Sequence, residues 1–136
     1  MDDVAASRSA AVRLVRTAER LKADFALAVE PSGLSTPAAR ALLLLDEPLP
    51  MGTLSGRLAC NQSYITRIAD ELETRGFVRR VPAADRRVQI LTLTPSGKRA
   101  RTSLFTAVTA GDRVQHRLSA AEQEQLDALL RRLLPD

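Results

Sequence analysis

Apolar side chains recur every three or four positions between Asp3 and Val29, and charged side chains fill many of the positions between them. The apolar positions are Val12, Val15, Ala18, Leu21, Phe25 and Val29. Because this spacing puts them on one face of a helix, the pattern predicts an amphipathic helix over the range. Pro31 and Gly33 are typical of its end. Ser35-Thr36-Pro37 is typical of the start of a second helix, which we expect to reach about Asp46.

The middle of the chain predicts two further helices joined by a tight turn. Glu47–Pro50 is a proline-containing connector, and a short helix is expected over about Gly52–Ala59. Asn61 is a candidate N-cap of the next helix, because its side-chain oxygen can accept a hydrogen bond from an otherwise unpaired backbone amide. Gly76 marks the end of that helix. Its expected buried positions are Ile65, Ile68, Ala69 and Leu72.

The chain beyond Gly76 predicts a hairpin followed by two helices. Residues 77–81 and 88–93 are rich in strand-forming side chains and flank the turn-prone segment Pro82–Asp85. Thr94-Pro95 predicts the start of a long helix that extends to about Arg117, with a bend near Gly111. Ser119 and Glu122 have the spacing of a capping box. The last helix has an apolar face of Leu126, Leu129, Leu130, Leu133 and Leu134.

This order of elements gives the expected fold class: mainly α with a small β-hairpin, a winged helix-turn-helix flanked by N-terminal and C-terminal dimerisation helices. At 136 residues, with 45% apolar and 26% charged residues, the chain has the length and composition of a single globular domain over 1–136. We expect the winged helix over residues 34–100 and the dimerisation helices over 3–30 and 95–134.

Positive charge is concentrated in the central region. Residues 51–101 hold ten Lys and Arg against four Asp and Glu, an excess of six, whereas the whole chain has a formal charge of +4. A local positive excess suits a phosphate-binding face, because neutralising phosphates releases condensed counterions. Charge counting alone is equally compatible with a solvated basic surface.

The outer face of the helix that follows Asn61 carries side chains able to hydrogen-bond to base edges. In helix-turn-helix proteins the N-terminal half of such a helix enters the major groove of duplex DNA. The hairpin adds four arginines, and an arginine at its tip can enter a narrow minor groove, where Asp85 could hold it in one rotamer. The outer residues of the helix are Gln62, Ser63, Tyr64, Thr66, Arg67 and Asp70, and the hairpin arginines are Arg79, Arg80, Arg86 and Arg87.

Several of these residues together resemble the MarR family of bacterial winged-helix transcription regulators. The matching positions, which lie within residues 34–100, are Leu54, Leu58, Thr66-Arg67, Leu72-Glu73, Arg75–Arg80, Asp85–Arg87 and Leu93–Gly97. The resemblance implies a homodimer that binds near-palindromic double-stranded DNA, as a repressor released by a small-molecule effector. It also assigns site residues. Base and phosphate contacts fall on Asn61, Gln62, Ser63, Tyr64, Thr66 and Arg67, minor-groove contacts on Asp85 and Arg87, and a further phosphate contact on Arg86.

The terminal helices carry more leucine than a small domain can cover, which independently predicts a partner surface. The candidate dimerisation residues are Leu14, Leu21, Leu126, Leu130 and Leu133. The alternative is that these leucines pack onto the chain's own winged helix.

Three features leave other functions open. The chain has Ala38 and Ala39 where the family often has glutamine and an aromatic residue, close to the pocket in which many members bind aromatic effectors, so the sequence predicts no particular effector. Cys60 is expected to be a buried small hydrophobe, with oxidation sensing as the alternative. A winged helix can also serve as a protein-interaction module without operator binding.

Catalysis, cofactors and metal binding find little support. His116 is the only histidine and Cys60 the only cysteine, so neither a metal cluster nor a nucleophile with its base can be assembled. We therefore expect no enzyme activity, no cofactor and no metal. The N-terminus has no leader-like pattern, and no apolar run approaches the roughly 20 residues of a membrane span. These features predict a cytoplasmic protein that does not associate with membranes.

Overall fold

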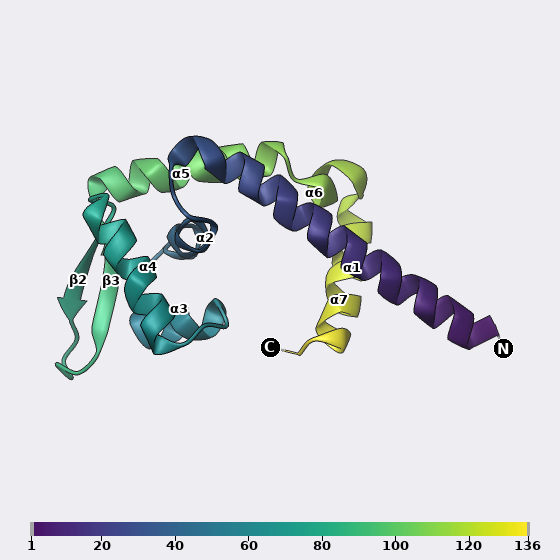
Figure 1. Cartoon of the computed structure of the whole chain (residues 1–136), viewed down its shortest axis with the longest axis horizontal. Coiled ribbons are helices and arrows are strands. Elements are labelled where there is room, and N and C mark those ends of the chain that lie inside the picture. Colours follow the sequence, from purple (N-terminus) through teal and green to yellow (C-terminus); the bar gives the residue numbers. More distant parts are fainter. Residues whose placement is uncertain (1, 136) are drawn as a thin grey trace. The chain divides into compact units, whose positions relative to one another are not determined.

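A computed structural model describes residues 2–135, and their contacts divide the chain into two compact units. One unit comprises residues 26–108 and contains the strands that the sequence predicts. The other is formed by the two ends of the chain, up to Phe25 and from Thr109 onward, and its described residues form helices (Figure 1). No helix within residues 2–135 has the length and apolar character needed to cross a membrane.

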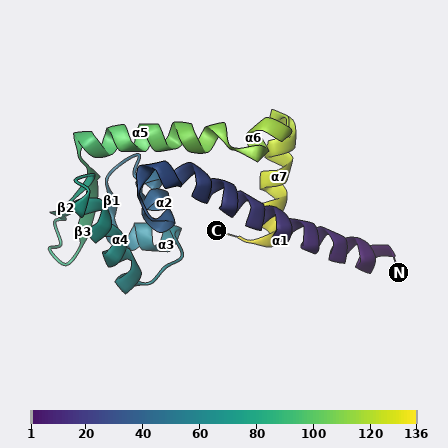
Figure 2. The same cartoon turned by 45° about the horizontal axis from the view of Figure 1, so that its top comes forward.

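The unit of residues 26–108 is a winged helix. Its helices are α2 (Thr36–Leu44), α3 (Met51–Arg57), α4 (Gln62–Thr74) and most of α5 (Pro95–Ala110), preceded by a 3-10 turn, η1 (Glu30–Ser32). Its strands are β1 (Leu49–Pro50), β2 (Val78–Pro82) and β3 (Gln89–Leu93), which form one antiparallel sheet in the order β1-β3-β2 (Figure 2). The predicted hairpin and the three predicted helices before it are confirmed.

The sheet has one strand more than the sequence predicted. The connector Glu47–Pro50 was expected to be irregular, but Leu49 pairs with Leu91 and Pro50 with Ile90. A strand of two residues carries too short a pattern to be recognised, and proline is compatible with it because β1 lies at the edge of the sheet. Leu49 is buried, so β1 also contributes a side chain to the core beside the hairpin.

The core of this unit is built from apolar side chains of its α-helices and strands. Leu42 of α2, Leu54 of α3 and Leu91 of β3 are fully buried. The predicted inner face of α4 is confirmed, because Ile65, Ile68, Ala69 and Leu72 are all buried. Since α4 uses one face for the core, its opposite face remains available to solvent.

Local hydrogen bonds fix both ends of α4. The side-chain oxygen of Asn61 accepts a hydrogen bond from the backbone amide of Tyr64 at 2.9 Å, which confirms the predicted cap. The preceding turn contains Ala59 in a left-handed conformation, with φ of 51°, a region that alanine rarely adopts. Gly76 follows α4 with φ of 74°, as expected of a glycine that ends a helix.

The base of the hairpin is tied to the start of α5. The hydroxyl of Thr94 donates to the carbonyl of Gly76 at 2.6 Å and accepts from the amide of Gly97 at 3.0 Å. The amide of Thr94 donates to the carbonyl of Phe77 at 3.0 Å. A Cβ atom on Gly97 would lie 1.9 Å from that carbonyl oxygen, so only glycine allows this close approach.

The unit formed by the chain ends contains most of α1 (Asp2–Val29), together with α6 (Arg113–Arg117) and α7 (Ala120–Leu133). The predicted continuous helix to Arg117 was wrong, because α5 ends at Ala110 and a new helix begins after Asp112. The carboxylate of Asp112 accepts from the amide of Val114 at 2.9 Å and so caps α6. The capping box of Ser119 and Glu122 is confirmed.

Candidate nucleic-acid interface

The solvent-facing side of α4 holds the polar residues that the sequence singled out. Gln62, Ser63 and Arg67 are exposed, and 41% of Tyr64 is exposed. Thr66 is half-buried, and its hydroxyl donates to the carbonyl of Gln62 at 2.9 Å, so its oxygen can still accept a hydrogen bond from a ligand. These side chains lie on the N-terminal half of the helix, where the positive end of the helix dipole favours anions.

A hollow of about 590 Å³ is lined by the start of α4, the start of α3 and the hairpin. Gln62 and Thr66 line it from α4, Thr53 lines it from α3, and Arg87 and Gln89 line it from the hairpin. The fold thus brings the first turn of α4 and the tip arginine of the hairpin to the same depression. A nucleic-acid backbone lying there would meet hydrogen-bonding groups on one side and a guanidinium on the other.

Two other predicted residues of α4 face a second hollow, of about 390 Å³, beside the start of α2. Tyr64 and Arg67 line this hollow together with Ser35. The backbone amide and the hydroxyl of Ser35 both donate to the carboxylate of Glu71, at 2.8 and 2.6 Å. Because Glu71 belongs to α4, these two bonds fix the position of the helix against α2.

The tip of the hairpin presents one arginine in a defined orientation. The carboxylate of Asp85 accepts from the backbone amide of Arg87 at 3.1 Å and from its guanidinium at 3.3 and 3.4 Å. The Arg87 side chain is nevertheless 91% exposed. The predicted pairing of Asp85 with a wing arginine is therefore present. It orders a cation that remains accessible to a ligand.

Arg80 differs from the other hairpin arginines. The sequence placed it on an exposed ribbon, but its side chain is only 21% exposed and its guanidinium pairs with Asp70 and, at 3.6 Å, with Glu73 of α4. Arg79 and Arg86 are exposed as expected. Sequence reasoning missed this cross-element pairing, because the spacing between β2 and the far end of α4 contains no local signal for it. The consequence is that Arg80 joins the wing to α4.

Cys60 lies in the turn between α3 and α4 and is half-buried, not fully buried as the sequence suggested. Its backbone amide donates to the carbonyl of Ser55 at 3.1 Å, and its own carbonyl accepts from the Ser55 hydroxyl at 2.7 Å. The backbone of Cys60 is thus hydrogen-bonded to Ser55 of α3 and stabilises the turn before α4. Oxidation sensing by this residue stays a prediction.

The leucines proposed for dimerisation fall into two groups within the terminal unit. Leu14, Leu130 and Leu133 are 42%, 38% and 68% exposed, and together they line one shallow hollow. Leu21 and Leu126 are half-buried and line a different hollow. Helix α7 buries none of its residues, so its apolar face is available to a partner.

A polar recognition helix packed beside a basic, ordered hairpin defines the class of winged-helix DNA-binding proteins. The sequence profile of the MarR family matches residues 34–88. A MarR-family transcriptional regulator from Silicibacter pomeroyi has a similar solved structure, with 30% identity, a TM-score of 0.78 and a match covering 92% of this chain and 87% of that one. The chain therefore belongs to the MarR family, whose members are transcriptional regulators and not enzymes.

Other solved structures agree in fold. A probable transcriptional regulator from Pseudomonas aeruginosa is 28% identical, with a TM-score of 0.74 and coverage of 91% of this chain and 96% of that one. CouR from Rhodococcus jostii RHA1, solved with bound p-coumaroyl-CoA, is 24% identical, with a TM-score of 0.83 and coverage of 96% and 95%. A search of curated protein sequences gave no significant match.

Proposed function

We propose that this MarR-family regulator is a homodimer that represses transcription by binding a near-palindromic operator in double-stranded DNA. The observation that carries the proposal is the hollow between α4 and the hairpin, where Gln62 and Thr66 lie opposite Arg87. A DNA backbone can follow this hollow while the start of α4 enters the major groove. Two copies related by a twofold axis would then read two half-sites.

The proposed base-reading residues are those at the exposed start of α4. Gln62 has the amide geometry that pairs with adenine, and Arg67 has the guanidinium that pairs with guanine or holds a phosphate. Ser63 and Tyr64 are exposed beside them and supply hydroxyl groups for base or phosphate contacts. Asn61 is assigned a positioning role, because its side-chain oxygen is occupied by the helix cap.

The proposed minor-groove residue is Arg87, and Asp85 orders its side chain before DNA is bound. Pre-ordering lowers the entropy cost of fixing a long side chain on binding. Arg79 and Arg86 are exposed and suit phosphate contacts. Arg80 is proposed to set the position of the wing through Asp70 and Glu73 rather than to contact DNA itself.

The proposal of a homodimer rests on the uncovered apolar side chains of the terminal unit. Leu129 and Leu133 of α7 are 56% and 68% exposed, and Leu134, which follows the helix, is 80% exposed. An amphipathic helix with no fully buried residue gains stability by packing its apolar face on a partner. A second copy offers the same surface and therefore suits a symmetric interface.

Two structural relatives were solved with a bound ligand: CouR with p-coumaroyl-CoA and NadR with 4-hydroxyphenylacetate. By analogy, we assign to this chain a small-molecule effector that releases it from DNA. At 24% identity both relatives share the fold with this chain, and the chemistry of its effector has to come from its own residues.

The test is a selection from a random duplex library with the purified full-length protein, followed by sedimentation of the protein alone and with the enriched duplex. The proposal expects an enriched sequence with twofold symmetry and a complex of two chains per duplex. The protein-interaction alternative expects no enrichment. A stable monomer that binds every duplex equally would contradict the proposal.

A further inference from the structure

Arg75, the C-cap residue of α4, connects the end of this helix to residues 29–35, the segment between α1 and α2. Its guanidinium donates to the carbonyl of Ser32 at 2.8 Å and lies 5.2 Å from the centre of the Phe77 ring, within the range of a cation–π contact. A Cβ atom on Gly33 would lie 3.3 Å from the same guanidinium, so glycine leaves room for this side chain. Arg75 is therefore ordered although it is exposed.

Segment 29–35 offers Arg75 a fixed acceptor. Val29 and Leu34 are only 2% and 8% exposed, so the segment is anchored in the core on both sides of Ser32. The hydroxyl of Ser32 donates to the carbonyl of Val29 at 2.6 Å and accepts from the amide of Leu34 at 3.1 Å. The carbonyl that receives Arg75 thus belongs to a turn that is held by its own hydrogen bonds.

Glu71 connects α4 to the same segment one helical turn before Arg75. Its carboxylate accepts from the backbone amide of Ser35 at 2.8 Å and from the Ser35 hydroxyl at 2.6 Å. Residues four positions apart lie on the same side of a helix. Glu71 and Arg75 therefore fix one flank of α4, and all of these contacts lie within the unit of residues 26–108.

The other flank of α4 is held by the wing, through the pairing of Arg80 with Asp70 and Glu73. At about 100° per residue, these two carboxylates and the pair of Glu71 and Arg75 lie on opposite sides of the buried stripe. The C-terminal half of α4 is thus fixed on both flanks. The outer face of its N-terminal half remains open to a ligand.

We propose that Glu71 and Arg75 are positioning residues that determine how well the protein distinguishes its operator from other duplexes, without contacting DNA themselves. Hydrogen bonds to base edges depend strongly on direction, whereas attraction to phosphates depends mainly on charge. A recognition helix that is free on one flank would lose affinity for the operator and keep most of its affinity for unrelated DNA. The inference rests on the proposed function, because it assumes that α4 reads the operator.

The charge of Glu71 separates this role from simple electrostatics. Removing a carboxylate makes the protein more positive, so electrostatics alone predicts tighter binding to every duplex. Glu71→Gln and Glu71→Ala remove the same charge, but only glutamine keeps an oxygen and an amide that can replace both bonds to Ser35. We expect Glu71→Ala to bind the operator more weakly than Glu71→Gln by at least the effect of one mismatched base pair, about fivefold.

The main test is a double variant that conserves net charge, Glu71→Ala with Arg75→Ala. Its matched control is Glu47→Ala with Arg99→Ala, at two exposed positions of the same unit. Fluorescence anisotropy with the full-length proteins measures the affinity for the selected operator and for a scrambled duplex of the same length, at several NaCl concentrations. The first pair should lower operator affinity about tenfold or more, and change neither the affinity for the scrambled duplex nor the salt slope. The control pair should change none of these quantities.

Hydrogen exchange of the free protein measures the effect on α4 without DNA. In the Glu71 and Arg75 double variant, the amides of residues 66–74 should exchange faster than in the wild type, while those of α5 keep the wild-type rate. The control pair should leave both rates unchanged. Faster exchange in α5 as well would indicate general unfolding, in which case the comparison of Glu71→Ala with Glu71→Gln decides.

Three results would overturn the proposal. Equal weakening towards the operator and the scrambled duplex would mean that the two residues do not affect discrimination. A smaller salt slope would make Arg75 a phosphate contact. Unchanged operator affinity with unchanged exchange would mean that packing alone positions α4. If the wild type selects no operator, the proposed function fails, and hydrogen exchange still decides whether Glu71 and Arg75 fix α4.

Discussion

Replacing Arg87 with glutamine should lower the salt dependence of DNA binding without affecting folding. The Arg87 side chain is 91% exposed, and its contact with Asp85 at 3.3 Å is an exposed pair of the kind that contributes at most about 1 kcal/mol to stability. A homodimer presents this arginine twice. Each DNA phosphate neutralised contributes about 0.9 to the slope of log affinity against log salt, and an arginine in the minor groove is counted as neutralising one of the phosphates that flank it. Losing two arginines should therefore reduce the slope by about 1.8.

The measurement is fluorescence anisotropy with a labelled operator duplex at several NaCl concentrations. Between 50 and 200 mM NaCl, a slope smaller by about 1.8 means that the affinity of the variant falls about tenfold less than that of the wild type. The comparison variant is Asp70→Asn with Arg80→Gln, which removes the ion pair at the base of the wing while conserving net charge. Its affinity should fall, because the wing is less well positioned, but its slope should stay at the wild-type value.

Two results would refute this reasoning. An unchanged slope for the Arg87 variant would mean that the wing tip does not reach DNA. A slope that falls equally in the Asp70 and Arg80 variant would mean that Arg80 contacts phosphate directly and that its pairing with α4 is lost in the complex.

Four further outcomes are expected. Arg67→Ala should cost about 1 to 3 kcal/mol of operator binding if Arg67 reads a base, and equal weakening across all duplexes in the same anisotropy assay would make it a phosphate contact. Gly97→Ala should lower the free energy of unfolding in urea by about 3 kcal/mol, the upper end of the cost of overpacking, because its Cβ would lie 1.9 Å from a backbone oxygen; an unchanged midpoint would contradict this. Leu133→Glu, at a position 68% exposed, should shift the protein towards monomer in sedimentation without unfolding it, and an intact dimer would exclude this leucine from the interface. The pKa of Asp24 is lowered, mainly by its hydrogen bond from Arg113. The ionised carboxylate therefore contributes to stability above the usual pKa of 3.8, and this contribution is lost as the pH falls through the lowered pKa. Urea denaturation between pH 5 and pH 2 should show a smaller loss of stability in Asp24→Asn than in the wild type.

The helices and the hairpin could be predicted because their signals are local. The spacing of Ile65, Ile68 and Leu72 defines one face of α4, and the caps at Asn61 and Ser119 are formed by side chains within three residues of the amides they bind. Such patterns depend only on helix geometry and short-range hydrogen bonds. These local patterns can therefore be recognised without knowing how the rest of the chain folds.

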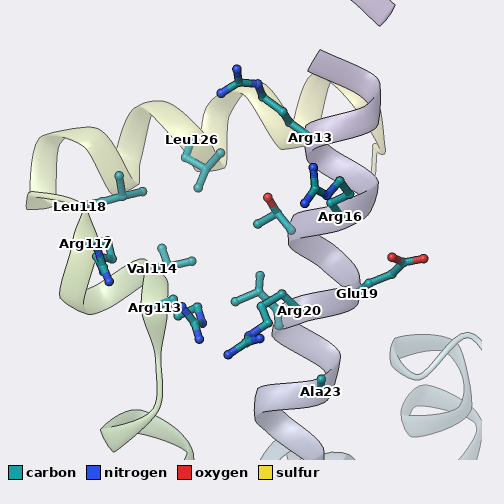
Figure 3. A pocket seen from close by; sticks show the side chains of 12 residues that line it. Arg13, Arg16, Glu19, Arg20, Ala23, Arg113, Val114, Arg117, Leu118 and Leu126 are labelled. Atoms are coloured by element: carbon teal, nitrogen blue, oxygen red, sulfur yellow. The ribbon is translucent and has the colours of Figure 1, made fainter. Parts of the chain in front are cut away.

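The features that sequence reasoning missed depend on contacts between distant segments or on very short elements. The pairing of Arg80 with Asp70 arises only when β2 has folded against α4. The strand β1 is too short to show alternation, and Gly111 suggested a bend where Asp112 in fact starts a new helix. The hollow between α1, α6 and α7 (Figure 3) likewise collects residues from both ends of the chain, and no spacing along the sequence indicates that Arg16 and Arg117 line the same hollow.

The most direct test of the central claim is hydroxyl-radical footprinting of the full-length protein on the duplex enriched by selection. A dimer that inserts two copies of α4 into successive major grooves should protect two symmetric half-sites whose centres are about 10 base pairs, or one helical turn, apart. Protection of a single half-site, or uniform protection independent of sequence, would contradict the claim that a twofold pair of recognition helices reads the operator.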